Sequence, residues 1–213
     1  VATGEILAMV NLPSYNPNAR EASPPSTHRN RALTDVVEPG SVIKALTVAA
    51  ALENGVDPDI VIPTTPLTVS GHPIRDVHDY GPVTLERLLM KSSNIGASRL
   101  ALGMDNARFH DVLQRFGFGQ STGSGFPGES AGVLAPARSW GQLEKATISY
   151  GYGLSVTPLQ LAQAFAALGN GGRLMPPTFI RGAGQEGRQA MDPKIATNVL
   201  HMLESVIEPG GSA

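Results

Sequence analysis

What the sequence lacks narrows its chemistry before any motif is considered. Its 213 residues include no cysteine, which excludes disulfides, thiolate zinc sites and a thiol nucleophile. No apolar run approaches the roughly 18 residues of a membrane-spanning helix, and the N-terminus shows no signal-peptide pattern. A basic excess is also missing, because 16 Lys and Arg stand against 18 Asp and Glu. No nucleic-acid partner is therefore expected.

The composition is that of one globular domain. Hydrophobic residues make up 41% of the chain and charged residues 16%, which separates it from disordered and fibrous sequences. The length allows a single sizeable core. The strand-like run Glu5–Val10 follows a turn at Thr3-Gly4, and the chain ends in the linker-like stretch 209–213. We therefore expect residues 1–213 to be a partial domain that is truncated at both ends.

Apolar periodicity and capping residues predict a mainly helical chain. Helices are expected at 41–54, 83–90, 95–102, 106–116, 157–168 and 192–207. Thr157 and Asp192 each precede a proline, which is typical of a helix start. Only 5–10 and 67–70 are predicted to form strands. The proline-rich segment 11–40 and the glycine-rich segment 117–139 are predicted to be long loops.

The sharpest local feature is a serine at a helix start with a lysine three residues later. Pro39 and Gly40 break the chain immediately before Ser41, and Lys44 follows one turn along. Residues three apart share a helix face, so the Lys44 amine can reach the Ser41 hydroxyl. A serine is a poor nucleophile until a base takes its proton, and a helix N-terminus favours developing negative charge. We expect Ser41 to be a nucleophile and Lys44 its base, with burial or a second cation lowering the lysine pKa.

A second polar cluster strengthens this pattern, since Ser-x-x-Lys alone occurs by chance about once in such a chain. Alone, it also describes a capping serine and a surface lysine. The tetrad Lys91-Ser92-Ser93-Asn94 lies between two predicted helices and contains Ser-x-Asn. In a serine acyltransferase, Ser92 can relay a proton to the leaving amine, and Asn94 can hold a substrate carbonyl or position the lysine. Helix capping by Ser92 or Ser93 is the simpler alternative.

With three further segments, these motifs resemble the penicillin-recognising serine transferases. The resemblance is strongest to class B penicillin-binding proteins of the division septum in Gram-negative bacteria. The further segments are Arg29-Asn30-Arg31 followed by Glu38-Pro39-Gly40-Ser41, Gly125-Phe126-Pro127-Gly128-Glu129, and Tyr150-Gly151-Tyr152-Gly153-Leu154-Ser155-Val156-Thr157-Pro158. They occur in the family's order and spacing and extend over essentially the whole chain.

The resemblance implies a D,D-transpeptidase. Such an enzyme acylates its serine with a peptidoglycan stem peptide ending in D-Ala-D-Ala, releases D-Ala and passes the acyl group to an amine on another strand. β-Lactams mimic the dipeptide and trap the acyl-enzyme. The resemblance implies catalytic roles for Ser41, Lys44 and Ser92, and substrate contacts for Asn94, Tyr150 and Tyr152. No metal or cofactor is expected.

The fold and cellular setting are likewise implied by the resemblance. The expected fold is the α/β penicillin-binding and β-lactamase-like one, an antiparallel sheet flanked by helices, with an all-helical region that carries Ser92 to Asn94. Most of the sheet is expected outside this chain. The implied location is the periplasmic face of the bacterial inner membrane, with divisome membrane proteins as partners and a membrane anchor outside these residues.

One motif of the family is absent. No Lys-Ser/Thr-Gly occurs in the 213 residues. The resemblance implies that this segment supplies a second oxyanion donor, a hydroxyl for the substrate carboxylate and a cation near the lysine. We expect it to be missing, disordered or on a second chain, and we expect the fragment alone to be inactive.

Other interpretations stay open. Gly119-Gln120-Ser121-Thr122-Gly123 matches Gly-x-Ser-x-Gly, but it lacks the strand before and the helix after that a nucleophile elbow requires, so a turn is expected. The five histidines lie too far apart for a helical metal pair. A serine β-lactamase shares the serine and lysine, but no Glu-x-x-x-Asn follows Ser-x-Asn where class A enzymes have one. A non-catalytic β-lactam sensor or scaffold is the third possibility.

Overall fold

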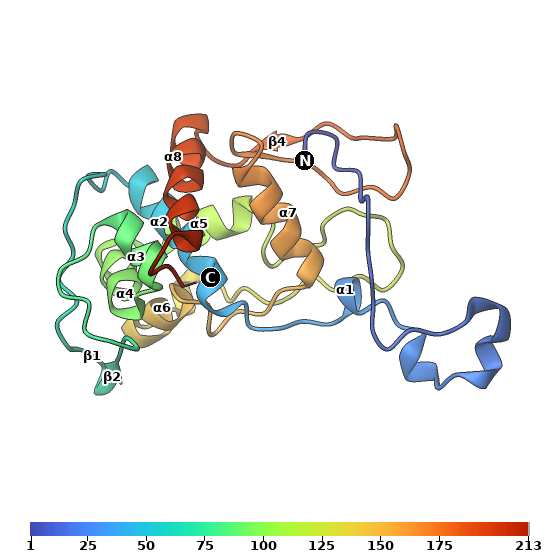
Figure 1. The fold of residues 1–213 in the computed structure, drawn as a ribbon, viewed down its shortest axis with the longest axis horizontal. Coiled ribbons are helices and arrows are strands. Elements are labelled where there is room, and N and C mark those ends of the chain that lie inside the picture. Colours follow the sequence, from blue (N-terminus) through green and yellow to red (C-terminus); the bar gives the residue numbers. More distant parts are fainter. Residues whose placement is uncertain (213) are drawn as a thin grey trace.

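The computed structural model describes residues 1–212. Figure 1 shows most of the helices gathered on one side, while α7 and the extended N-terminal segment lie on the other. The α-helices are α1 (Arg31–Thr34), α2 (Lys44–Glu53), α3 (Leu85–Lys91), α4 (Asn94–Gly103), α5 (Asn106–Arg115), α6 (Gln142–Ile148), α7 (Pro158–Leu168) and α8 (Pro193–Glu204). Short 3₁₀ helices are η1 (Pro17–Ala22), η2 (Pro25–Thr27), η3 (Gly40–Ile43), η4 (Ala137–Ser139) and η5 (Ser205–Ile207).

The strands within residues 1–212 form two small antiparallel hairpins. In one, β1 (Leu67–Val69) pairs with β2 (His72–Ile74), and in the other β3 (Arg173–Leu174) pairs with β4 (Arg188–Gln189). The first hairpin confirms the strand predicted at 67–70. It matters for the site because the chain leaving β2 passes beside the start of α4.

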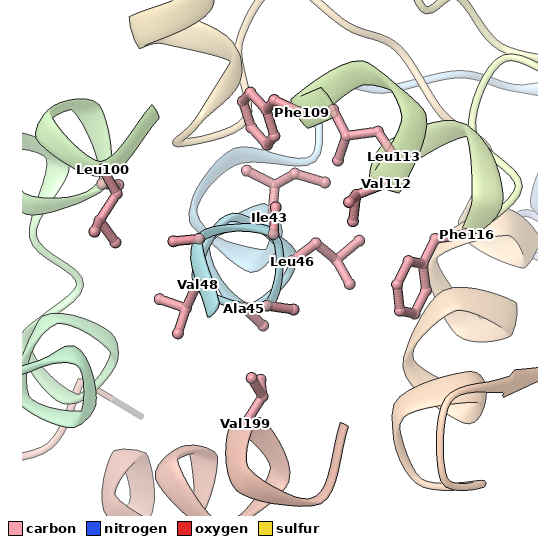
Figure 2. Close-up of a cluster of buried hydrophobic side chains, with 14 of the residues drawn as sticks. Ile43, Ala45, Leu46, Val48, Leu100, Phe109, Val112, Leu113, Phe116 and Val199 are labelled. Carbon is pink, nitrogen blue, oxygen red and sulfur yellow. The ribbon is translucent and has the colours of Figure 1, made fainter. Parts of the chain in front are cut away.

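The hydrophobic core is built around α2. Residues 44–51 of this helix are all buried, and α2 contacts α3, α4, α5 and α8. Figure 2 shows Ile43 and Leu46 facing Phe109 and Leu113 of α5, with Val199 of α8 on the opposite side. Full burial of each such side chain contributes about 2 kcal/mol. The helix that begins beside the predicted nucleophile is therefore the central helix of the core.

Helix starts predicted from capping residues are confirmed. The Thr157 side chain accepts a hydrogen bond from the Gln160 N–H at 3.1 Å, and the Gln160 side chain accepts one from the Thr157 N–H at 2.8 Å, which completes a capping box. Asp192 caps α8 by accepting from the Lys194 N–H at 2.8 Å. Helix α8 buries Ala196 and Val199, whereas Leu200 is 40% exposed.

The predicted strand at 5–10 is wrong. Only Glu5 forms a bridge, parallel to Thr178, with the Ile6 N–H donating to the Thr178 carbonyl at 2.9 Å. Leu7 is 91% exposed and Val10 is also exposed. The continuous apolar run at 6–10 favours a strand, but a strand also needs a neighbour along its whole length, and residues near Thr178 run alongside this segment only at its start.

None of the helices within residues 1–212 combines the length and hydropathy that crossing a bilayer requires.

Candidate active site

Ser41 lies in a 3₁₀ turn rather than in the α-helix that the sequence predicted from this residue onward. The turn η3 leads directly into α2 at Lys44. Gly40 adopts a φ of +60°, which a residue with a side chain rarely takes, and its N–H donates to the Gly151 carbonyl at 3.0 Å. Ser41 is exposed, whereas Lys44 is only 2% exposed. The hydroxyl is thus accessible, and the amine below it is enclosed.

The Lys44 amine is at the centre of three short contacts. It donates to Ser41 Oγ at 2.9 Å, to the Ser92 carbonyl at 2.6 Å and to Ser92 Oγ at 2.9 Å. Burial lowers the pKa of Lys44 to about 8, against an opposing effect of the Asp76 carboxylate, which raises it. The structure therefore brings Ser41, Lys44 and Ser92 together, although Ser92 is 48 residues from the lysine in sequence.

The donors on this amine dictate how it can act. An ammonium has three N–H donors, enough for all three oxygens, whereas a neutral amine has two N–H donors and one lone pair. The Ser92 carbonyl can only accept, so it keeps one N–H in either state. In the neutral state the lone pair can face a hydroxyl, and the Ser41 hydroxyl then becomes the donor. The Lys44 amine can accept the serine proton without moving.

Neighbouring serines of the tetrad have separate local roles. Ser92 ends α3 in the left-handed conformation, with φ 54° and ψ 45°, while Ser93 caps α4 by accepting from the Gly96 N–H at 2.9 Å. The capping alternative thus applies to Ser93, and Ser92 is left to face Lys44. A non-glycine residue at positive φ is strained and persists only where its surroundings hold it.

Asn94 begins α4 beside these serines. Its side-chain amide donates to the Arg75 carbonyl at 3.1 Å, and this bond, not one to Lys44, holds the amide. The Asn94 amide therefore does not position Lys44 directly. Its role as a substrate ligand stays a prediction.

Tyr150 and Tyr152 occupy the loop 149–153, here called the tyrosine loop, which is bonded to the segment that carries Ser41. Their rings meet edge to face with centroids 5.8 Å apart. Burial, and secondly Tyr152, raise the pKa of the Tyr150 hydroxyl. The Gly153 N–H donates to the Glu38 carboxylate at 2.9 Å, and Thr47 Oγ1 of α2 donates to the Ser149 carbonyl at 2.8 Å. Residues 149–153 are thus fastened to the segment that carries Ser41, and the Tyr152 side chain is half-exposed.

Sequence reasoning missed Asp76 and Glu38. The Asp76 carboxylate accepts three hydrogen bonds at the start of α4, and Glu38 holds the tyrosine loop. Asp76 belongs to no motif, and although Glu38 opens the segment Glu38-Pro39-Gly40-Ser41, its partner Gly153 lies 115 residues away. The only available signal was that Glu38 adjoins the Pro-Gly-Ser break.

The competing motif forms a loop, as predicted. The Thr122 N–H of this motif donates to Glu129 Oε1 at 2.7 Å, and Ser124 Oγ, just after the motif, donates to Glu129 Oε2 at 2.7 Å. Ser121 is exposed and lies between no strand and helix of the kind that a nucleophile elbow requires. Across residues 1–212, no group of three or more His, Asp or Glu side chains is arranged to hold a metal ion.

An exposed serine, a buried lysine of lowered pKa and a second serine on the same amine define the class of serine and lysine acyl-transfer sites. The chain belongs to the penicillin-binding protein transpeptidase domain family, which it matches over residues 1–213. It is 44% identical over 213 residues to peptidoglycan D,D-transpeptidase FtsI of Escherichia coli (strain K12), an alignment that covers 99% of this chain and 36% of that protein.

A second relative and a solved structure place the chain in the same family. The probable peptidoglycan D,D-transpeptidase PbpC of Pseudomonas aeruginosa is 43% identical over 210 residues, which cover 97% of this chain and 37% of that protein. The apo transpeptidase domain of Burkholderia pseudomallei penicillin-binding protein 3 superimposes with a TM-score of 0.87 at 39% identity, covering 99% of this chain and 61% of that one. These likenesses confirm the predicted family and fold class. The chain spans just over a third of the length of these two curated relatives.

Proposed function

We propose that this chain carries the serine centre of a septal peptidoglycan D,D-transpeptidase, acylated at Ser41 by stem peptides and by β-lactams. The observation that carries the proposal is the 2.9 Å contact between the buried Lys44 amine and the exposed Ser41 hydroxyl. The names of the relatives, peptidoglycan D,D-transpeptidases, support the substrate class.

Acylation begins with proton transfer. Neutral Lys44 accepts the Ser41 proton while Oγ attacks the carbonyl carbon of the D-Ala-D-Ala peptide bond. The backbone N–H of Ser41, in the first turn of η3, favours the negative charge that develops on the carbonyl oxygen. The C–N bond then breaks, and the D-Ala amine leaves with a proton that passes from the Lys44 ammonium through Ser92 Oγ. An ester on Ser41 remains.

The second half-reaction transfers the acyl group. An amine of another stem peptide attacks the ester carbonyl, the C–O bond breaks, and Ser41 Oγ regains a proton by way of Lys44. A β-lactam opens on the same serine, but its leaving amine stays tethered in the product. Asn94, Tyr150 and Tyr152 are proposed to contact the bound peptide, an assignment that the half-exposed position of Tyr152 supports.

The cellular setting follows from the same proposal. Bacterial cell-wall enzymes among the relatives fit a location on the periplasmic face of the inner membrane. A membrane anchor outside these residues and contacts with divisome membrane proteins complete the proposal.

The test is covalent labelling of a chain that carries these residues together with a Lys-Ser/Thr-Gly segment. After incubation with a fluorescent penicillin, the label should map to the peptide that contains Ser41. Ser41→Ala should abolish labelling, and the matched control Ser121→Ala, at the exposed serine of the competing motif, should leave it intact. A label on any other residue would overturn the assignment.

Two further measurements separate the alternatives. A β-lactamase would lose its label within seconds to minutes through deacylation, whereas a transpeptidase keeps it. A non-catalytic sensor would take the label yet release no D-Ala from a thioester or peptide that mimics D-Ala-D-Ala. Stable label together with turnover is the result that we expect.

A further inference from the structure

The carboxylate of Asp76 lies against the N-terminus of α4. Its Oδ2 accepts from Ser93 Oγ at 2.6 Å, and its Oδ1 accepts from the backbone N–H groups of Asn94 at 2.6 Å and Ile95 at 3.0 Å. Hydrogen bonds to a charged acceptor are about twice as strong as neutral ones. A carboxylate at this end of a helix is also favoured by the macrodipole. Asp76 thus anchors the turn between α3 and α4.

This turn delivers two of the three oxygens on the Lys44 amine. Ser92, directly before Ser93, holds a left-handed conformation that is strained for a residue other than glycine. Its carbonyl and hydroxyl both accept from Lys44. The strained residue is therefore held by Lys44 on one side and, through Ser93 and Asn94, by Asp76 on the other.

We propose that Asp76 is a positioning residue of the acylation centre, whose carboxylate fixes the turn from Ser92 to Asn94 so that both Ser92 oxygens stay on the Lys44 amine. The inference rests on the proposed function. It adds to that function a residue that acts through Ser92, Ser93 and Asn94 and not by direct contact with Ser41.

Two substitutions separate geometry from charge. Asp76→Ala removes all three bonds that the carboxylate accepts. Asp76→Asn keeps an oxygen for the two backbone N–H groups, and its amide can donate to Ser93 Oγ, which has a second lone pair for this bond. A displacement of about 1 Å at a reacting group can cost on the order of 100-fold in rate. We expect about that loss of the acylation rate constant for Asp76→Ala, and recovery to within about tenfold of wild type for Asp76→Asn.

The measurement is stopped-flow acylation by a β-lactam, with the rate constant separated from the dissociation constant of the initial complex. It is made at about pH 9.5, where the Lys44 amine is largely neutral, so that loss of the Asp76 charge contributes little. The rate constant should fall while the dissociation constant stays within about threefold of wild type. A loss confined to initial binding would overturn the proposal, and so would an unchanged rate.

Asp105→Ala is the matched control. The Asp105 carboxylate caps α5 through the N–H groups of Ala107 at 2.8 Å and Arg108 at 3.2 Å, and it lies outside the site. This variant should lose stability to a similar extent and keep the wild-type acylation rate. Equal slowing in both alanine variants would show a general stability effect and reject positioning by Asp76.

A crystal structure of Asp76→Ala gives a readout independent of activity. Ser92 should leave the left-handed region and its contacts with Lys44 should lengthen; if both are retained, the proposal is wrong even if acylation is slow. Should the alanine variant fail to fold, the rate constant and structure of Asp76→Asn decide in its place. Absence of acylation in the wild-type protein would instead count against the proposed function.

Discussion

Lys44 occupies a position that is costly for a cation and useful for a base. An unpaired charge in a protein interior is strongly disfavoured, so a buried lysine gives up its proton more readily. Burial lowers its pKa to about 8 even though Asp76 acts in the opposite direction. At pH 7 about a tenth of the amine is then neutral, compared with less than about a thousandth for an exposed lysine.

Acylation by a β-lactam should therefore rise with pH and level off above about pH 8, with the slope of a single ionisation. The sign follows because, in the proposed mechanism, the neutral amine accepts the Ser41 proton, and its fraction grows as pH passes the lysine pKa. Rates measured between about pH 6 and pH 10 test this. Lys44→Arg, which stays charged throughout, should lose at least about 100-fold. A flat profile, or an active arginine variant, would contradict the role of Lys44 as base.

For single residues, the sequence allowed a contact to be predicted where the two residues lie close together in the chain. Ser41 and Lys44 lie one turn apart, so their contact could be predicted from the helix period alone. The resemblance, not the spacing, selected Ser92 as the partner on the amine. Asp76 could not be predicted, because its bonds to Ser93 and Asn94 depend on how a hairpin packs against a helix 17 to 19 residues further along.

The tyrosine loop and the 3₁₀ turn behave as one structural unit. Gly151 has a φ of +93°, and its carbonyl accepts from the Gly40 N–H. A Cβ at Gly151 would overlap the backbone of Gly40, immediately before Ser41. Gly153 also has a positive φ, but a Cβ there would meet only side chains of Ile148 and Thr147 at 3.6 and 3.7 Å. The two glycines share the same backbone requirement and differ in the space around them.

Gly151→Ala should consequently slow acylation of Ser41 by at least about tenfold, because the clash displaces the segment that carries the serine. Gly153→Ala is the control, since it imposes a comparable φ penalty of about 1 kcal/mol without the overlap. Unfolding free energies and acylation rates of both variants are needed. Equal rates in the two variants would show that the loop does not set the position of the serine.

Among elements, those with strong local signals were predictable. Thr157 and Asp192 accept hydrogen bonds from N–H groups of their own helices, so the residues next to them in sequence were enough to predict their roles. Helix α6 was not predicted, because Lys145 is buried there and interrupts the apolar pattern. Its amine donates to the Met104 carbonyl at 2.8 Å, a partner that only the fold supplies. The prediction of a strand at 5–10 was wrong for the opposite reason. The apolar run there is clear in the sequence, but the fold supplies no neighbouring strand beyond Glu5.

On the scale of the whole molecule, stability and the site share α2. Leu46 of this helix is fully buried among α5 and α8, whereas Leu200 of α8 is 40% exposed. Leu46→Ala should lower the free energy of unfolding by about 3 kcal/mol, because a buried leucine leaves a cavity. Leu200→Ala, the same change on a solvent-facing site, should cost less than about 1 kcal/mol. Denaturant unfolding of both variants measures the difference, and similar losses would show that α2 is not the central packing element.

The burial of residues 44–51 has an evolutionary consequence. These positions both hold the Lys44 amine against Ser41 and fill the core, so a substitution that moves Lys44 also disturbs the packing of its neighbours along the helix. Drift in this segment is constrained from both directions. Substitutions at exposed positions such as Tyr152, which is 51% exposed, are expected to disturb the interior far less.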